Sequence, residues 1–438
     1  MLFQLLTESS FFLSVLCVQV PQDAQVLTQC NSSNIFDGII PQGYKKAVAP
    51  STGDKEVDIY ITLQIADIYG LDEESMDFYV HMYFDDMWRD ERLATKCIQR
   101  ARPIILPEEV AENLWVPDIY FENSKWGEMF KISVPNTNVK VMQDGMIYRY
   151  SRYVLQISCP MDLRFYPMDI QICSIRVALF AHPDDVARLH WTNDLDSPVK
   201  DIDAIVLLSP VKLPQFKLSA VNTTEHTENW NTGNYTSMIA KFTFARHLTS
   251  YIVNTYIPSV LVVLMSWLSF WLDVGAVPAR VTLGVTSLLT LATQVVQSRS
   301  SIPPVAYINA LDVWLFFCIN MVFSTLVEYA ISYYISFYKT FDGKCLCFPF
   351  QRCTGNFIKK TIADQSNAVS SKVSWVSSEG PTERLASSSE KQQKILGSTV
   401  SSTKCIDKIS RLIFPFFFLI FNIMYWPYYL TFSTPGSD

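Results

Sequence analysis

Four long apolar runs constrain this chain more than any other feature. Each holds about 18 or more mostly apolar residues, which is enough for an α-helix to cross a bilayer. The runs predict membrane spans at residues 250–272, 279–301, 307–335 and 411–432. The last run carries Trp426, Tyr428 and Tyr429, and such aromatic side chains favour a membrane interface. The chain is therefore expected to be a multi-pass membrane protein.

The N-terminus predicts the orientation of these spans. Residues 1–24 contain an apolar run of signal-peptide length, which we interpret as a cleaved signal. Residues 25–248 and the C-terminus are then extracellular at the plasma membrane, and residues 336–410 are cytoplasmic. The charges agree, because 336–410 hold 11 Lys and Arg against 6 Asp and Glu, whereas 25–248 hold 21 against 30.

The exported region predicts a β-rich fold. It alternates apolar and polar side chains in short runs such as VDIYITLQIADIYG and SMIAKFTFAR, separated by turn signals. Many short strands of this kind indicate a β-sandwich. A short helix is expected within PEEVAENLWVPDIYF, before a further strand. Three Asn-x-Ser/Thr sequences predict N-glycosylation at Asn31, Asn222 and Asn234.

The cytoplasmic segment differs in composition. Asp364–Thr403 is rich in Ser, Lys and Gln and has almost no aromatic residues. Such a segment cannot bury enough apolar surface to offset its ordering entropy. Residues 336–410 are therefore expected to be largely disordered.

Four cysteines lie in the exported region. Cys159 and Cys173 enclose a 13-residue interval, PMDLRFYPMDIQI. A disulfide between them would close a loop of about 15 residues and stabilise the fold by about 3 kcal/mol in the chain-entropy account. Cys30 and Cys97 either pair or stay free, and the spacing leaves both alternatives open.

The motif CPMDLRFYPMDIQIC, followed by four spans of which the second reads PARVTLGVTSLLTLATQ, resembles the Cys-loop pentameric ligand-gated ion channels. It is most similar to the anion-selective branch, with the glycine, GABA and invertebrate chloride channels. WVPDIYFEN, YIPSVLVVLMSWLSFWL and IPPVAYINALDVW add independent matches. The resemblance implies a homo- or hetero-pentamer in which each subunit has an extracellular β-sandwich followed by a four-helix transmembrane bundle, with the second span lining a pore.

The second span carries a polar stripe. At about 3.6 residues per turn, its polar residues recur on one side of the helix. Such a stripe faces water or other protein, and interhelical packing of small polar residues would also explain it. The resemblance favours a pore lined by Pro278, Ala279, Arg280, Thr282, Thr286, Leu289 and Thr293. Five copies of Leu289 would form a hydrophobic ring that gates by dewetting.

The start of this helix predicts anion passage. Its unpaired N–H groups and positive dipole end would face the cytoplasmic entrance. Cation-selective relatives place a Glu just before the first basic residue of this helix, where this chain has Ala279 preceded by an additional Pro278. Arg280 adds positive field and can also act as an interfacial anchor. Chloride is therefore the expected ion.

The resemblance also implies a coupling pair between the ligand-binding domain and the pore. Asp169 in the Cys loop and Arg246 before the first span match an acid and a base that the family pairs at this junction. Removing either partner of a buried ion pair is costly. We expect such a change to damage gating, assembly or both.

An agonist site between subunits is implied at matching aromatic positions, which are Tyr120, Phe180, Trp230 and Tyr235 on one face and Tyr83 on the other. Aromatic faces suit a cation. Asp85 stands where amino-acid-gated relatives carry an Arg, and Ala178 where they often carry an acid. His226 and Ser237 occupy the positions of the second disulfide of glycine receptors. These departures argue against a glycine, GABA or glutamate receptor of the usual kind.

Three histidines, His81, His182 and His226, map near the same site. Histidine titrates near neutral pH and is a common metal ligand. With Asp85, they predict gating by protons, a divalent metal or a biogenic amine. No close metal-ligand spacing links the three, and surface histidines are common. The alternative is a modulatory subunit of a heteromeric chloride channel that contributes no binding face.

Catalysis and carrier chemistry are not expected. The chain has no Gly-rich phosphate loop, no H-E-x-x-H pair and no Cys/His cluster within a span, and acids within spans are few, notably Asp312 and Glu328. We therefore expect no enzyme activity, no cofactor and no nucleic-acid partner. The expected partners are other Cys-loop subunits, the lipid bilayer, chloride and a small extracellular agonist.

Overall fold

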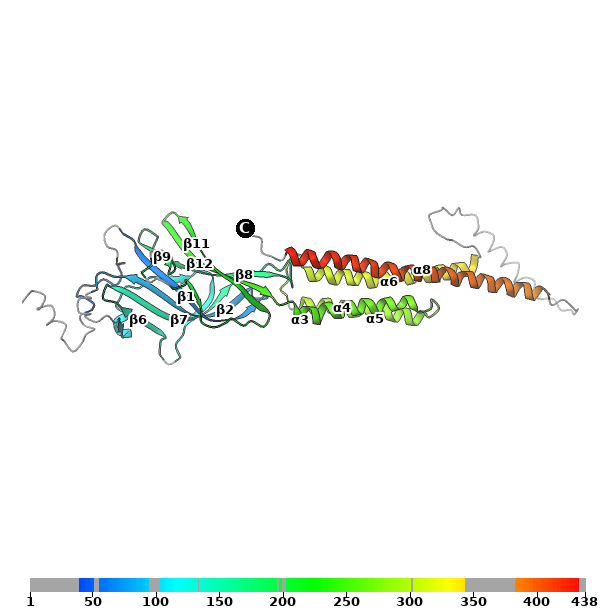
Figure 1. Ribbon diagram of the computed structural model, residues 1–438, viewed down its shortest axis with the longest axis horizontal. Helices are drawn as coiled ribbons and strands as arrows, with labels where there is room; N and C mark the ends of the chain where they lie inside the picture. The colour runs from blue at the N-terminus through cyan, green and yellow to red at the C-terminus, as the bar shows by residue number, and fades with distance from the viewer. Residues whose placement is uncertain are drawn as a thin grey trace, which may run out of the picture. The chain divides into compact units, whose positions relative to one another are not determined.

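The computed structural model describes residues 39–50, 55–93, 103–132, 134–194, 197–198, 202–300, 302–342 and 383–432 (Figure 1). The expected signal peptide, Asn31, Cys30 and Cys97 lie outside these residues. The chain folds into two units. One contains the residues up to Asp162 with Ile170–His247, and the other contains Leu163–Asp169 with the residues from Leu248 onward. The first is built of strands and the second of helices.

The strand unit is a β-sandwich, which confirms the predicted fold class. Its larger sheet has the order β10-β1-β2-β7-β6-β3, with β9 pairing with β1 and β5 with β7. These strands are β1 (Val57–Asp72), β2 (Asp77–Arg89), β3 (Ile104–Leu106), β5 (Ser124–Met129), β6 (Thr137–Val141), β7 (Met146–Ser158), β9 (Ala187–Trp191) and β10 (Ile205–Leu207). The smaller sheet has the order β11-β12-β8-β4. It is formed by β4 (Ile119–Phe121), β8 (Ile170–Leu179), β11 (Phe216–Trp230) and β12 (Gly233–Arg246).

Strand β2 shows how the alternating pattern makes both a core and an outer face. Phe78, Val80, Met82 and Phe84 are buried, while the residues between them are only half-buried. Successive side chains of a strand point to opposite faces, so one short run supplies both surfaces. Asp86 is a charged residue on the buried face, and an ion pair with Arg149 at 2.9 Å compensates its charge.

Two local predictions in this unit are confirmed. Helix α2 (Glu108–Ala111) precedes β4, as expected within PEEVAENLWVPDIYF. Cys159 and Cys173 form a disulfide with an S–S distance of 2.06 Å. The bridge joins the end of β7 to β8 and closes the loop whose tip, Leu163–Asp169, belongs to the helical unit.

The helical unit contains, within the described residues, four stretches that are long and apolar enough to cross a membrane: Thr249–Trp271, Val277–Arg299, Ala310–Ser336 and Ile406–Thr431. The first comprises α3 (Thr249–Tyr251), the π-helical turn η3 (Ile252–Tyr256), α4 (Ile257–Trp267) and the 3₁₀ turn η4 (Leu268–Trp271). The others lie in α5 (Val277–Arg299), α6 (Ala310–Asp342) and α8 (Glu383–Phe432). Pro258 has no N–H for the helical ladder, which accounts for irregular hydrogen bonding in the preceding turn.

Helix α8 begins much earlier than expected. It starts at Glu383, whereas the sequence predicts a span from residue 411 and disorder before it. For residues 383–403 the sequence predicts disorder, whereas the structure has the first part of this helix. Glu, Leu, Ala, Gln and Lys are good helix formers, and no proline occurs between Glu383 and Phe414, so scarcity of aromatic residues does not prevent a helix here. Residues 364–382 lie outside the described part of the chain.

Close packing and an aromatic cluster hold the helical unit together. A Cβ at Gly284 of α5 would lie 2.2 Å from a methyl carbon of Leu326, so a larger residue here would force the Leu326 side chain of α6 to move. Trp314 is buried and donates from its indole nitrogen to the Ser259 hydroxyl at 2.8 Å. The hydroxyls of Tyr256 and Tyr425 are 2.9 Å apart. These contacts join α4 to α6 and η3 to α8 through satisfied polar groups.

Candidate functional site

Helix α5 divides into a face buried within its own subunit and an exposed face. Arg280, Gly284, Ser287 and Leu291 are buried. The other six predicted pore residues are exposed, namely Pro278, Ala279, Thr282, Thr286, Leu289 and Thr293. Leu289 is 64% exposed although it is a large apolar residue. The stripe predicted from helical periodicity therefore points away from the subunit's other helices.

The threonines of this stripe satisfy their own hydroxyl protons. Thr282 donates to the carbonyl of Pro278 at 2.6 Å, and Thr286 donates to the carbonyl of Thr282 at 2.7 Å. The same pattern continues at Thr290, 2.8 Å from the carbonyl of Thr286. Each oxygen keeps lone pairs that can accept a hydrogen bond from water. The hydroxyl protons of the stripe are thus paired within the helix, and its oxygens can still bind water.

Arg280 is the predicted pore residue that the structure places elsewhere. It is 1% exposed, and its guanidinium donates to the two carboxylate oxygens of Asp407 at 2.8 and 3.2 Å and to the carbonyl of Leu272. The side chain lies inside the subunit's own helices because Asp407, on α8, supplies the opposite charge there. Sequence reasoning missed Asp407, since 127 residues separate the two partners.

We expect loss of the Arg280–Asp407 pair to lower the free energy of unfolding of the subunit strongly. Asp407→Ala leaves a buried guanidinium without its carboxylate, and breaking a buried pair in this way typically costs about 3–5 kcal/mol. Thermal unfolding of detergent-solubilised protein measures the effect. The Arg280→Ala/Asp407→Ala double variant should be more stable than the sum of the two single losses predicts. If the loss of stability in the double variant equals the sum of the two single losses, the two side chains do not stabilise each other.

The C-terminal end of α5 carries a second, more exposed ion pair. Arg299 donates to Asp312 of α6 at 3.1 Å, and its side chain remains 65% exposed. Such a pair contributes little stability. Arg299 therefore keeps part of its positive field available to solvent at this end of the helix.

The tip of the Cys loop is joined to the third span. The backbone N–H groups of Ala310 and Leu311 donate to the carbonyls of Arg164 and Tyr166 at 3.0 and 3.1 Å. The first N–H groups of a helix lack partners within the helix, so these carbonyls act as its cap. The Leu163 N–H also donates to the Tyr307 hydroxyl at 3.0 Å. These hydrogen bonds hold the loop tip against the start of α6.

Arg246, the base of the predicted coupling pair, ends β12 with a fully buried side chain. It donates to the carboxylate of Glu73 and lies over the ring of Phe216 at 4.4 Å. Sequence reasoning missed Glu73, which sits in the acidic turn after β1. Asp169 is buried in the helical unit. The Asp169–Arg246 pairing stays a prediction.

Four of the predicted ligand-site aromatics lie on the smaller sheet and its loops. Tyr120 is on β4, Phe180 follows β8, and Trp230 and Tyr235 lie on either side of the β11–β12 turn. The rings of Tyr120 and Phe180 meet edge to face at 5.5 Å. Phe180 and Trp230 are 76% and 61% exposed, which is unusual for large aromatic side chains. We call these four residues the aromatic face.

Two acids accompany the aromatic face. Glu228 accepts a hydrogen bond from the Trp230 indole nitrogen at 3.2 Å. Glu122 accepts from the Ser237 hydroxyl at 3.5 Å. Burial, and then the negative charges of Glu122 and Glu228, raise the pKa of Tyr120. Arg176 lies 3.8 Å from Glu122 and offsets part of its charge, so Glu228 is the acid that adds negative charge beside Trp230.

His81, Tyr83 and Asp85 project from the outer face of β2. Tyr83 stacks on Tyr150 with ring centres 5.1 Å apart. His81 accepts a hydrogen bond from Arg152 at 2.6 Å, and burial together with that positive charge lowers the pKa of His81. The three residues predicted on this strand thus share one surface.

Only one of the two carboxylate oxygens of Asp85 has a hydrogen-bond partner among the described residues. One carboxylate oxygen accepts from the Gln64 amide at 2.6 Å, while the other is buried with no hydrogen-bond partner among the described residues. Burial raises the pKa of Asp85 to about 7, and Asp86 adds to this effect while the Gln64 hydrogen bond and Lys140 oppose it. An acid that changes charge near neutral pH therefore lies next to Tyr83.

The raised pKa of Asp85 makes stability depend on pH. The folded protein keeps the proton up to about pH 7, whereas the unfolded chain releases it near 3.8, so the free energy of unfolding falls as pH rises from about 4 to 7. Asp85→Asn should therefore stabilise each subunit at pH 8, by an amount on the order of 4 kcal/mol, and change little near pH 4. Thermal unfolding at the two pH values measures this. Glu225→Gln, at an exposed acid on β11, should show no such pH-dependent gain.

The other two candidate histidines have separate partners. His182 Nδ1 lies 2.7 Å from Asp118, and His226 Nε2 lies 4.0 Å from Glu228. Among the residues that the structure describes, no three His, Cys, Asp or Glu side chains are arranged to hold a metal ion. A metal site made by these histidines would need ligands beyond those of one subunit's described residues.

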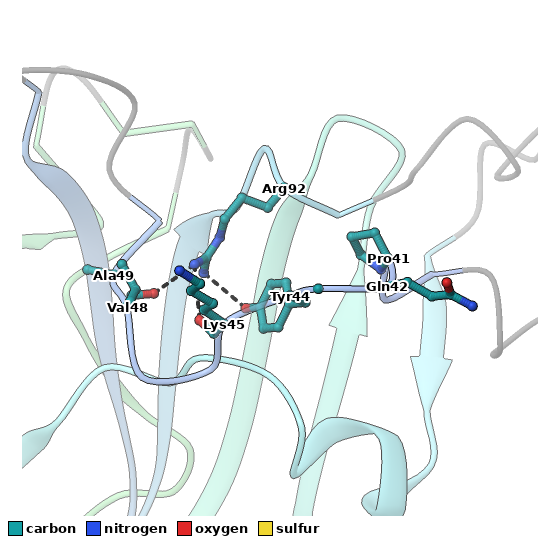
Figure 2. A pocket seen from close by; sticks show the side chains of 8 residues that line it. Pro41, Gln42, Tyr44, Lys45, Val48, Ala49 and Arg92 are labelled. Atoms are coloured by element: carbon teal, nitrogen blue, oxygen red, sulfur yellow. Dashed lines mark hydrogen bonds between the residues drawn. The ribbon is translucent and has the colours of Figure 1, made fainter.

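A pocket of about 360 Å³ occurs near the start of the described chain (Figure 2). It is lined by Pro41, Gln42, Gly43, Tyr44, Lys45, Val48, Ala49 and Arg92. Arg92 donates to the Val48 carbonyl at 2.7 Å and to the Tyr44 hydroxyl at 3.1 Å, and it pairs with Asp90 at 2.8 Å. Its charge is therefore already compensated. None of the predicted ligand-site residues lines this pocket, and the hydrogen bonds of Arg92 connect residues 44–48 to the segment after β2.

Comparisons with known proteins find a family match for each of the two units. Residues 32–248 match the family model of the neurotransmitter-gated ion-channel ligand binding domain, and residues 255–344 match that of the transmembrane region. The chain is 32% identical over 451 residues to a glutamate-gated chloride channel of Drosophila melanogaster, with 96% of each chain covered. It is 29% identical over 440 residues to the gamma-aminobutyric acid receptor subunit pi of Bos taurus, with 97% of each covered. The protein therefore belongs to the Cys-loop family of neurotransmitter-gated ion channels, a family of membrane channels and not of enzymes.

Proposed function

We propose that this chain is a subunit of a chloride channel opened by an extracellular ligand. The observation that carries the proposal is the start of α5, where Pro278 and Ala279 are exposed and the first turn holds no acidic residue. Backbone N–H groups and the positive end of the helix dipole then dominate this entrance. Five such ends around one axis would attract anions. The chloride channel among its relatives supports the same ion.

The reversal potential tests the ion. Currents through the protein expressed alone in oocytes should reverse near the chloride potential. Replacement of external chloride by a large impermeant anion should shift that potential, while replacement of sodium should not. A current that follows sodium and ignores chloride would contradict the proposal.

We also propose that the N-terminal domain and the C-terminus lie outside the cell at the plasma membrane. The predicted signal peptide and the four spans support this orientation. An epitope tag placed after Asp438 should be reached by antibody on intact cells. Labelling only after permeabilisation would contradict it.

The agonist is proposed to be a proton, a divalent metal or a biogenic amine rather than glycine, GABA or glutamate. Asp85 replaces the arginine of amino-acid-gated relatives, and Glu228 adds negative charge beside Trp230. Both features favour a positively charged ligand against aromatic rings. Within the described residues the metal alternative has the least support, because no three suitable ligands come together.

Dose–response measurements test the site. His81→Ala, Asp85→Asn, His182→Ala and His226→Ala are each compared with wild type for protons, zinc, copper and a panel of amines. His190→Ala is a matched control, because His190 pairs with Asp58 at 3.1 Å outside the candidate site. A potent amino-acid agonist, or four unchanged responses, would contradict the proposal. Current only on co-expression with another subunit would favour the modulatory alternative.

A further inference from the structure

The end of the first span packs against helix α8 through an arginine and two aromatic contacts. Arg411 of α8 donates from Nη2 and Nε to the Phe270 carbonyl at 2.8 and 3.2 Å, and its guanidinium lies 4.4 Å from the centre of the Trp271 ring. The rings of Phe270 and Phe414 are 5.0 Å apart. The last carbonyls of a helix lack partners within that helix, and Arg411 supplies one here. These contacts hold η4 against α8.

Arg411 and Lys408 are two neighbouring cations without a carboxylate partner among the described residues. Lys408 is exposed, Arg411 is half-buried, and neither forms an ion pair in this part of the chain. The adjacent acid, Asp407, is already paired with Arg280 at 2.8 Å. The Phe270 carbonyl engages only two of the five N–H groups of the Arg411 guanidinium. The two side chains therefore present unused donors and two positive charges.

Exposed apolar side chains flank the two cations. Trp271, beside Arg411, is 68% exposed, and Leu412 is 76% exposed. At 3.6 residues per turn, Lys408 lies about 60° around α8 from Arg411, and Leu412 lies about 40° beyond Lys408. The membrane-spanning stretch of α8 begins at Ile406, so at 1.5 Å per residue the two cations lie about 3 and 8 Å from its start. This is the depth of lipid headgroups, where tryptophan side chains are also favoured.

We propose that Lys408 and Arg411 bind the headgroup of an anionic phospholipid of the cytoplasmic leaflet, while Trp271 and Leu412 contact its acyl chains. Phosphate oxygens accept hydrogen bonds from guanidinium and ammonium groups. A net negative headgroup compensates both cations, whereas a zwitterionic headgroup brings a positive charge of its own. The exposed acid Asp273, two residues after Trp271, forms no ion pair with either cation. The inference depends on neither the ion nor the agonist, and it takes only the choice of leaflet from the proposed orientation.

Lipid binding is measured by native mass spectrometry of the full-length protein in a neutral detergent, titrated with phosphatidylserine or phosphatidylcholine. Lys408→Gln should weaken phosphatidylserine binding about fivefold, and Lys408→Gln/Arg411→Gln should weaken it further, with little change for phosphatidylcholine. Arg299→Gln is the matched control, because Arg299 is an exposed cation of the same unit that is paired with Asp312. It should bind phosphatidylserine as the wild type does. Unchanged phosphatidylserine binding in the double variant would overturn the proposal.

Two comparisons separate lipid binding from a purely structural role of the cations. Arg411→Gln also removes the partner of the Phe270 carbonyl, so the variant is expected to lose stability in any lipid. Lys408 has no hydrogen bond or ion pair with the described residues, so Lys408→Gln tests the headgroup alone. Glycerophosphoserine, the same headgroup without acyl chains, should bind far more weakly than phosphatidylserine. Equal affinity for glycerophosphoserine, or an equal loss of both lipids in Lys408→Gln, would overturn the proposal and leave the chloride-channel proposal untouched.

Discussion

Replacing Leu289 by serine is expected to leave the channel conducting without any agonist. Leu289 is 64% exposed on the stripe of α5 that faces away from its own subunit. Five such side chains around a pore would form an apolar constriction from which water withdraws, and ions cannot pass a dry constriction. A serine hydroxyl binds water, so the ring should stay wet and open probability should rise.

The measurement is the holding current in agonist-free solution. Leu289→Thr should act in the same direction, because it also introduces a hydroxyl. Val281→Thr is the matched control, since Val281 is exposed on the same helix but lies about 80° around it from Leu289 at 3.6 residues per turn. Unchanged gating in expressed Leu289→Ser would show that Leu289 does not face the lumen.

Deleting Pro278 and changing Ala279→Glu together should turn an anion channel into a cation channel. Ala279 is exposed at the start of α5, so a carboxylate there would join four others around the entrance. The helix dipole stabilises a negative charge at this end and keeps it ionised. A ring of five carboxylates reverses the sign of the local potential and therefore the preferred ion.

Diluting sodium chloride on one side of the membrane shifts the reversal potential. The shift of the variant should have the opposite sign to that of the wild-type channel. The control is the same deletion with Ala279→Gln, which matches the size of Glu without its charge and should remain anion-selective. If both variants select cations, pore geometry and not charge determines the ion. Because Asp407 compensates Arg280, we expect position 279 to influence selectivity more than position 280 does.

The fold could be predicted because the sequence patterns that indicate strands and spans each involve residues close together in the chain. The alternation along β2 and the apolar runs of the spans each depend on neighbouring residues and on one fixed period. The exposed stripe of α5 follows from the same periodicity, since Pro278, Thr282, Thr286, Leu289 and Thr293 are all exposed. The start of α8 was not predictable from composition, because the same polar residues are compatible with both a helix and a disordered segment.

The sequence by itself determined the two-unit fold, the family and the face of α5 that points outward. The tertiary structure alone decided which charged groups meet. Arg280 with Asp407, Arg246 with Glu73 and the half-satisfied carboxylate of Asp85 each depend on segments brought together by packing. A local sequence pattern indicates the period of a helix or strand. The partner of a buried charge depends instead on which residues the fold brings close together. Helical periodicity alone places Arg280 about 200° around α5 from Pro278, opposite the exposed stripe, whereas its partner Asp407 could not be named from sequence.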